Sequence, residues 1–248
     1  MITQITQVNE TLLTILRKTP LEAVRISALL DTYGLNQPFF TVYWQDNGKA
    51  ILAELDGTFF IIASKGANYE ELSLFLRMKP SFAQLIGNYQ AVRQIITYQQ
   101  GGKCDRFVQM FSIFPLDIGR SFSIDKHPDL QEAFQMTHLP EEQANAWKRD
   151  MTARLYHKAA NIYLIRNQTE PISICMISAQ SGYAGLISSV YTKKMWRGNG
   201  YASFLTLSAA KDLFMANKTA LLECKETLCP FYARLGFSMS GEIGVYVV

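Results

Sequence analysis

The sequence predicts a mixed α/β chain with two domains, and three observations support this fold class. Segments with apolar residues at helical spacing alternate with short β-prone runs. The 248 residues, 48% of them hydrophobic, are enough for one large domain or two small ones. Residues 115–127 show little periodicity. We therefore predict an N-terminal α+β domain over residues 1–118 and a mixed-sheet α/β domain over residues 119–248.

The first half is predicted to begin with helices and to continue as a β meander. Pro20 separates two stretches with apolar residues at helical spacing. Asn47-Gly48 is a strong hairpin turn because both residues tolerate positive φ. Asn68 suits a helix N-cap. The predicted elements are two helices over residues 8–33, strands over 39–44, 50–55 and 58–63, helices over 69–78 and 89–98, and a strand over 106–114.

The second half is predicted to mix helices with a longer run of strands. Pro140, followed by Glu141 and Glu142, marks a helix start. The apolar residues between 202 and 213 give one buried helix face. The predicted elements are helices over residues 129–136 and 141–157, strands over 161–166, 172–178 and 183–192, a helix over 199–216, a strand over 219–224, a helix over 227–235, and one or two strands over 237–248.

The segment between the strand that ends at residue 192 and the next helix is a candidate anion site. Gly198 and Gly200 let the backbone turn tightly and approach a ligand closely. The helix behind them adds unpaired N–H groups and the positive end of its dipole. Lys193, Lys194 and Arg197 add positive charge. This pattern favours a phosphate or pyrophosphate ligand.

A second motif runs from Phe231 to Phe237 and strengthens this interpretation. Together the two segments resemble the GNAT family of acetyl-CoA-dependent N-acetyltransferases. That family's coenzyme loop has the pattern Gln/Arg-x-x-Gly-x-Gly/Ala, and a later helix often ends in Tyr-x-x-Leu-Gly-Phe. Gly198 and Gly200 match the loop, whereas Met195 departs from it. Matches to the second motif are Tyr232, Leu235, Gly236 and Phe237.

The resemblance covers roughly residues 125–248 and implies the GNAT fold there. The first half has neither motif, so two alternatives remain open for it: a degenerate copy of the same fold, or an unrelated α+β domain.

The resemblance also implies acetyl-CoA as co-substrate. Backbone amides of the glycine loop would hold its pyrophosphate, and the end of the preceding strand would pair with the pantetheine arm. The cofactor-binding candidates are Val190, Tyr191, Thr192, Arg197, Gly198, Asn199, Gly200, Tyr201 and Ala202. We expect no metal, because Cys224 and Cys229 lack a second nearby Cys or His pair. All four cysteines are expected to be reduced thiols.

Two residues are candidates for proton transfer. Tyr232 would protonate the leaving thiolate, because a phenol is protonated at neutral pH; the alternative is a packing role. No carboxylate lies in residues 184–190, so Glu223 is the nearest candidate base and Glu226 the next. Either of them could instead be structural or exposed. We expect direct attack in a ternary complex, since no histidine is placed to activate Cys229 for a covalent route.

Composition limits the partners. A net charge of +3 is too mild to indicate nucleic acid. No apolar run approaches the ~20 residues of a membrane span, and the first residues lack a secretion signal. We expect a cytoplasmic protein with a small-molecule or peptide amine as acceptor. It could also form a homodimer.

Two alternative functions fit parts of this pattern. Gly198-x-Gly200-x-x-Ser203, with Glu223 some distance on, mimics a dinucleotide-binding fingerprint. These glycines do not directly follow a strand, and repeated βαβ units are missing. The other alternative is a non-catalytic acyl-CoA sensor or scaffold. Two features favour it: Met195 departs from the coenzyme-loop pattern, and no catalytic base is evident.

Overall fold

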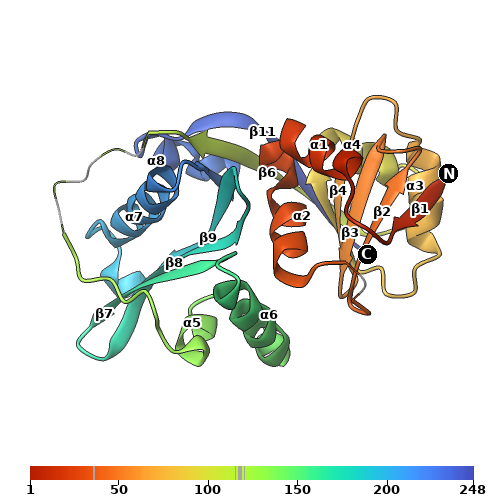
Figure 1. Ribbon diagram of the computed structural model, residues 1–248. Helices are drawn as coiled ribbons and strands as arrows, with labels where there is room; N and C mark the ends of the chain where they lie inside the picture. The colour runs from red at the N-terminus through yellow and green to blue at the C-terminus, as the bar shows by residue number, and fades with distance from the viewer. Residues whose placement is uncertain (36, 115, 117–118, 120) are drawn as a thin grey trace. The chain divides into compact units, whose positions relative to one another are not determined.

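The structure is a computed structural model that describes the chain except for residues 36, 115, 117, 118 and 120, and it divides into two compact units (Figure 1). Unit 1 comprises Met1–Gln109, Glu223–Cys229 and Met239–Val248. Unit 2 comprises Met110–Leu222 and Pro230–Ser238. The predicted boundary at 118/119 falls where several residues lie outside the described part, so it stays a prediction.

Unit 1 is a sheet with helices on both faces. Its strands follow the order β1-β2-β3-β4-β5-β11-β6, in which β4 pairs in parallel with β5, and β11 pairs antiparallel to β5. Its elements are β1 (Ile2–Ile5), α1 (Glu10–Lys18), α2 (Pro20–Tyr33), β2 (Phe40–Gln45), β3 (Ala50–Leu55), β4 (Thr58–Ala63), α3 (Tyr69–Arg77), β5 (Gln84–Asn88), α4 (Tyr89–Ile96), β6 (Lys103–Ser112) and β11 (Ser238–Val247).

Alternation along the strands divides the core of unit 1 into two layers. Phe40 and Val42 of β2 pack with α1 and α2, whereas Tyr43 packs with α3 and α4 on the opposite face. Figure 1 shows α1 and α2 on one side of this sheet and α3 on the other. This arrangement follows from the period of two in a strand. The meander and the helices agree with the predictions, but β1 and β5 were not predicted.

Unit 2 has the same kind of layered arrangement. Its sheet order is β10-β9-β8-β7, with β9 and β10 parallel. Helices α5 and α6 cover one face around Met151, Ile162 and Ile174, and α7 lies on the other face (Figure 1). Its elements are α5 (Leu130–Gln135), α6 (Ala144–Tyr156), β7 (Asn161–Asn167), β8 (Glu170–Gln180), β9 (Ala184–Thr192), α7 (Tyr201–Met215) and most of β10 (Thr219–Cys224) and α8 (Cys229–Ala233). The last two residues of β10 and the first residue of α8 belong to unit 1.

The order of elements repeats along the chain. From α1 to β6 it is helix, helix, three strands, helix, strand, helix, strand, and from α5 to β11 it is the same. Each series contains one parallel pair, β4 with β5 and β9 with β10. The first half therefore repeats the secondary-structure pattern of the second, and the mixed α/β class predicted for both is confirmed.

Candidate functional site

Strand β9 carries the first group of predicted site residues and departs from a regular ladder. Its parallel pairs with β10 run from Ala184–Thr219 to Ile187–Leu222, and β9 then continues to Thr192. The antiparallel register with β8 shifts just before Tyr191, where Ser189 has a φ of 50°. Such a bulge bends a strand and disrupts its ladder. The bulge therefore falls at Ser189 and Val190, after which Tyr191 and Thr192 pair again with Ile174 and Ser173 of β8.

Tyr191 and Thr192 are anchored on the side of β8. The Ser173 hydroxyl donates to the Tyr191 carbonyl (3.0 Å) and lies 2.8 Å from the Thr192 hydroxyl. The Tyr191 ring packs edge-on against His138, with centroids 4.1 Å apart. These contacts fix the end of β9 from which the glycine loop departs.

The glycine loop has the backbone conformation that the sequence predicts. Gly198 and Gly200 have φ values of 82° and 88°, in the left-handed region that glycine adopts without strain. A Cβ built on Gly198 would meet no atom within 4 Å, so its neighbours leave open space. The Asn199 side chain donates to the Trp196 carbonyl (3.1 Å) and stabilises the turn.

Helix α7 begins at this loop without a side-chain cap. Gly200 occupies the N-cap position, and no side chain there accepts a hydrogen bond from the first turn. First-turn N–H groups of a helix need an acceptor, and the helix dipole favours a negatively charged one. Tyr201 and Ala202, in this turn, are only half-buried. The geometry suits an anion such as a pyrophosphate.

Two of the positively charged side chains beside the loop already have partners within the protein. Arg197 donates through Nε to the Thr192 carbonyl (3.0 Å), and its guanidinium lies 5.8 Å from the Tyr191 ring centroid. Lys193 forms an ion pair with Glu170 (2.8 Å). Arg197 is therefore oriented by backbone and ring, and Lys193 has a carboxylate partner. Met195 is 92% exposed and packs little against the loop.

A polar network with one buried member, Tyr163, holds the C-terminal half of α7 in place. Asp212 accepts hydrogen bonds from the Tyr163 hydroxyl (2.8 Å) and from the Lys126 ammonium (2.6 Å). Burial first, and then the bond to Asp212, raise the pKa of Tyr163 far above its usual value. Tyr163 therefore stays protonated and donates to Asp212 throughout the ordinary pH range.

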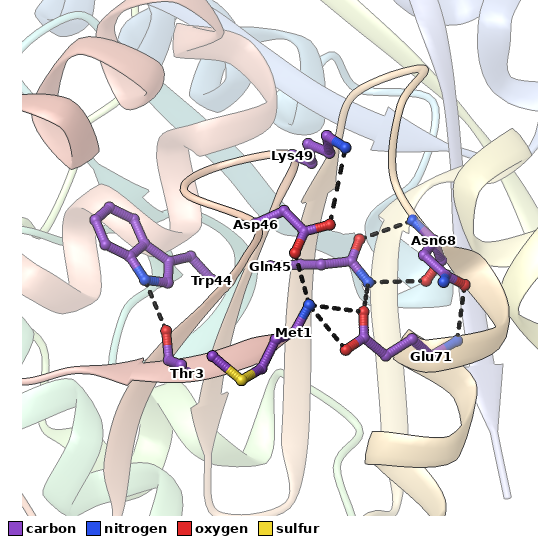
Figure 2. Close-up of polar contacts among 8 residues, drawn as sticks. All are labelled: Met1, Thr3, Trp44, Gln45, Asp46, Lys49, Asn68 and Glu71. Atoms are coloured by element: carbon purple, nitrogen blue, oxygen red, sulfur yellow. Dashed lines mark hydrogen bonds and ion pairs between the residues drawn. The ribbon is translucent and has the colours of Figure 1, made fainter.

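The corresponding helix of the first half, α3, has its N-terminus closed by protein groups (Figure 2). Asn68 caps it by accepting from the Glu71 N–H (3.0 Å), and the buried Gln45 amide binds both the N–H and the carbonyl of Asn68. Glu70 and Glu71 add negative charge to the first turn, and Glu71 also pairs with the amino group of Met1 (3.0 Å). This end is capped and acidic, so an anion would be repelled there.

Tyr232 lies in α8 and is 7% exposed. Its ring packs edge-on against Phe231 and Phe237, at centroid distances of 4.9 and 6.2 Å. The Tyr232 carbonyl accepts from the N–H groups of Leu235 and Phe237, and Gly236 provides the positive φ (84°) of this helix end. The second motif thus forms a compact helix stop around Tyr232.

Glu223 is bound by an arginine, and both residues belong to unit 1. Arg25 of α2 donates to both oxygens of its carboxylate, at 2.8 and 2.6 Å, and both side chains are largely buried. Two parallel bonds of this kind fix the orientation of a carboxylate. Glu226, in contrast, is exposed and pairs with Arg106 (2.9 Å). Sequence reasoning did not find Arg25, because no motif links α2 to the end of β10.

Comparison with known proteins supports the resemblance. Residues 127–237 match the family described as "Acetyltransferase (GNAT) family". A search among curated proteins gave no match. This chain therefore carries a GNAT domain of the acetyltransferase family over residues 127–237.

Solved structures share the fold over nearly the whole chain. A Drosophila protein is 12% identical with a TM-score of 0.65, and the match covers 99% of this chain and 98% of that one. A GCN5-related N-acetyltransferase from Kribbella flavida is 12% identical with a TM-score of 0.60, covering 92% and 95%. A tandem GNAT protein from the clavulanic acid biosynthesis pathway is 10% identical with a TM-score of 0.60, covering 100% and 98%. Identities this low show the fold alone.

Two further findings concern the described residues. None of their helices combines the length and hydrophobicity needed to cross a bilayer. No group of three or more His, Cys, Asp or Glu side chains among them is arranged to hold a metal ion.

Proposed function

We propose that this protein transfers an acetyl group from acetyl-CoA to a primary amine by direct attack in a ternary complex. One observation carries the proposal: an uncapped helix, α7, begins at two left-handed glycines in the loop that follows β9, a strand that bulges and extends beyond its pairs with β10. This arrangement offers main-chain N–H groups to a diphosphate, and it offers an extended chain the part of β9 that continues beyond its pairs with β10. Membership of residues 127–237 in the GNAT family supports acetyl-CoA as the ligand.

The loop and β9 would divide the binding of acetyl-CoA between them. The N–H groups from Gly198 to Ala202 would bind the pyrophosphate, since helix N-termini favour anions, and Arg197 would add charge. The end of β9, Val190 to Thr192, would pair with the pantetheine arm in the manner of an added strand. Its N–H groups could also polarise the thioester carbonyl.

The chemistry needs two proton transfers. The neutral amine attacks the acetyl carbon, a C–N bond forms, and the C–S bond breaks with its electron pair on sulfur. Tyr232 would give its proton to that thiolate, because a phenol stays protonated near neutral pH. Glu223 is the candidate base for the amine's proton; one of its bonds to Arg25 must then break.

The acceptor we propose is a primary amine of a small molecule or a peptide. A homodimer and a cytoplasmic location remain predictions from the sequence.

A ligand-induced change in melting temperature tests the coenzyme loop. At a concentration 100 times Kd, acetyl-CoA should stabilise the protein by about 2.7 kcal/mol, which corresponds to roughly 5–10 °C in Tm. Gly198→Val should abolish this shift, because a branched side chain would occupy the space where the anion approaches. Gly34→Val is the matched control, since Gly34 also has a positive φ (66°) with open space around it.

Two outcomes would contradict the proposal. An equal Tm shift in Gly198→Val and the unmodified protein would remove the loop from coenzyme binding. Coenzyme binding without acetyl transfer to any of a broad panel of amines would instead favour a non-catalytic sensor.

A further inference from the structure

Two cysteines lie side by side at the turn between β10 and α8. The Sγ atoms of Cys224 and Cys229 are 3.9 Å apart, although no disulfide joins them. Cys224 ends β10 and Cys229 begins α8. The short 3-10 helix Glu226–Leu228 joins them, closed by a bond from the Leu228 N–H to the Lys225 carbonyl (2.8 Å). The turn thus brings together two thiols that the sequence separates by four residues.

We propose that Cys224 and Cys229 form a reversible disulfide when the protein meets a peroxide. A disulfide requires the sulfurs to approach to about 2.05 Å, and the two Sγ atoms are already within 3.9 Å of each other. The other two cysteines are different: Cys175 is fully buried, and Cys104 lies in another part of unit 1 with no thiol recorded beside it in the described residues.

The different exposure of the two cysteines indicates which of them a peroxide oxidises first. Cys229 is half-buried and follows residues 225–228, all of which are exposed, so a small oxidant reaches it first. Cys224 is 4% exposed. Burial and the neighbouring Cys229 thiol raise the pKa of Cys224 to about 12. Because the thiolate is the nucleophile, Cys229 is the residue that a peroxide oxidises.

Atoms and electrons balance in two steps. The Cys229 thiolate attacks hydrogen peroxide, the O–O bond breaks, and a sulfenic acid and hydroxide form. Cys224 then loses its proton and attacks the Cys229 sulfur; the S–S bond forms and the sulfenic oxygen leaves as water. The second step requires deprotonation of a thiol with a raised pKa. Its rate should therefore rise with pH towards about 12.

A disulfide between Cys224 and Cys229 would fix the start of α8, the helix that carries Tyr232. Tyr232 lies three residues after Cys229, which is about one helical turn. If Tyr232 is the acid, and in this respect the inference rests on the proposed function, then locking Cys229 to the end of β10 should lower turnover. Formation of the disulfide itself does not depend on that role.

Peptide mapping tests the disulfide directly. Trypsin cleaves after Lys225 and so separates Cys224, in residues 219–225, from Cys229, in residues 226–234. After hydrogen peroxide, the full-length protein should lose about 2 Da, and these two peptides should appear linked until dithiothreitol is added. Cys229→Ser should lose the linked pair, and Cys104→Ser should keep it. Phenylarsine oxide, which bridges two close thiols, should block both in the unoxidised protein.

The results that overturn the proposal are specific. Oxidation of Cys229 to sulfinic acid with no linked peptides, at any pH up to 9, would show that Cys224 cannot resolve it. Linked peptides that include Cys104 would show unspecific oxidation. Turnover that falls several-fold on linkage and recovers with dithiothreitol supports the coupling to Tyr232, and unchanged turnover in fully linked protein overturns that coupling alone.

Discussion

At the scale of single residues, Tyr232 and Glu223 have opposite environments. Tyr232 is nearly buried and packed among aromatic rings at a helix end fixed by Gly236. Glu223 has both carboxylate oxygens bound by Arg25. Packing against aromatic rings fixes the position of Tyr232, whereas a bidentate ion pair fixes that of Glu223. The two proposed roles therefore need separate tests.

Tyr232→Phe should lower kcat on the order of 100-fold, because a general acid typically contributes that much or more. The Kd for acetyl-CoA should stay unchanged. Tyr183→Phe, at a half-exposed tyrosine, is the control for loss of a phenol. Activity retained in Tyr232→Phe would make Tyr232 a packing residue.

The Glu223→Gln variant distinguishes a role of Glu223 as catalytic base from a purely structural role as the partner of Arg25. If Glu223 is the base, Glu223→Gln should lower kcat at least tenfold. The loss in kcat should be smaller at high pH, because the amine is then already neutral. A carboxylate that serves only Arg25 should lower Tm with kcat unchanged, since breaking a buried pair is costly. Glu226→Gln, at an exposed carboxylate, is the matched control.

At the scale of elements, strand β11 lies inside the sheet of unit 1, between β5 and β6. Strand β11 pairs with β5 from Ile243–Asn88 to Val247–Gln84. Its Tyr246 is buried and donates to the Gly101 carbonyl (3.0 Å). The turn Gly101-Gly102 between α4 and β6 wraps this ring, and both glycines have positive φ. Packing at this turn therefore contributes to holding the C-terminal strand.

Gly102→Ala should destabilise the protein more than Gly101→Ala. A Cβ on Gly102 would lie 2.4 Å from the Tyr246 ring and hydroxyl, whereas a Cβ on Gly101 would meet nothing within 4 Å. Both changes carry the left-handed backbone cost of about 1–2 kcal/mol. Only Gly102→Ala adds overpacking, of about 1–3 kcal/mol. Urea unfolding measures the difference, and equal loss in both variants would show that Tyr246 does not constrain Gly102.

At the scale of the whole molecule, two halves share one order of elements but differ at one helix start. The N-terminus of α7 follows two glycines and has no side-chain cap. The N-terminus of α3 is capped by Asn68, whose backbone is bound by Gln45, and Glu71 lies in its first turn (Figure 2). We infer that the first half is a copy of the fold that does not bind coenzyme.

Calorimetric titration with acetyl-CoA should therefore give one site per chain. Gly198→Val should remove that site and leave none, because the acidic first turn of α3 repels phosphate. A stoichiometry of two, or a site that survives in Gly198→Val, would contradict this inference.

Much of the organisation could be predicted from local patterns. The glycine loop, the helix stop at Gly236 and most helices and strands depend on residues close in sequence, such as Asn47 at a hairpin or Asn68 at a cap. The strands β1 and β5 were not predicted, because each is short and stable only through its neighbours in the sheet. The bulge at Ser189 had no local signal, since its cause is the register between β8 and β9.

The sequence by itself determined the family and the loop, because a turn with two left-handed glycines before a helix is encoded within a few residues. Only the tertiary structure decided that β11 pairs with β5, that Arg25 binds Glu223, and that the thiols of Cys224 and Cys229 meet. The physical reason is that these contacts arise when separate segments pack. Arg25 and Glu223 are 198 positions apart, and no spacing along a chain specifies such a pair.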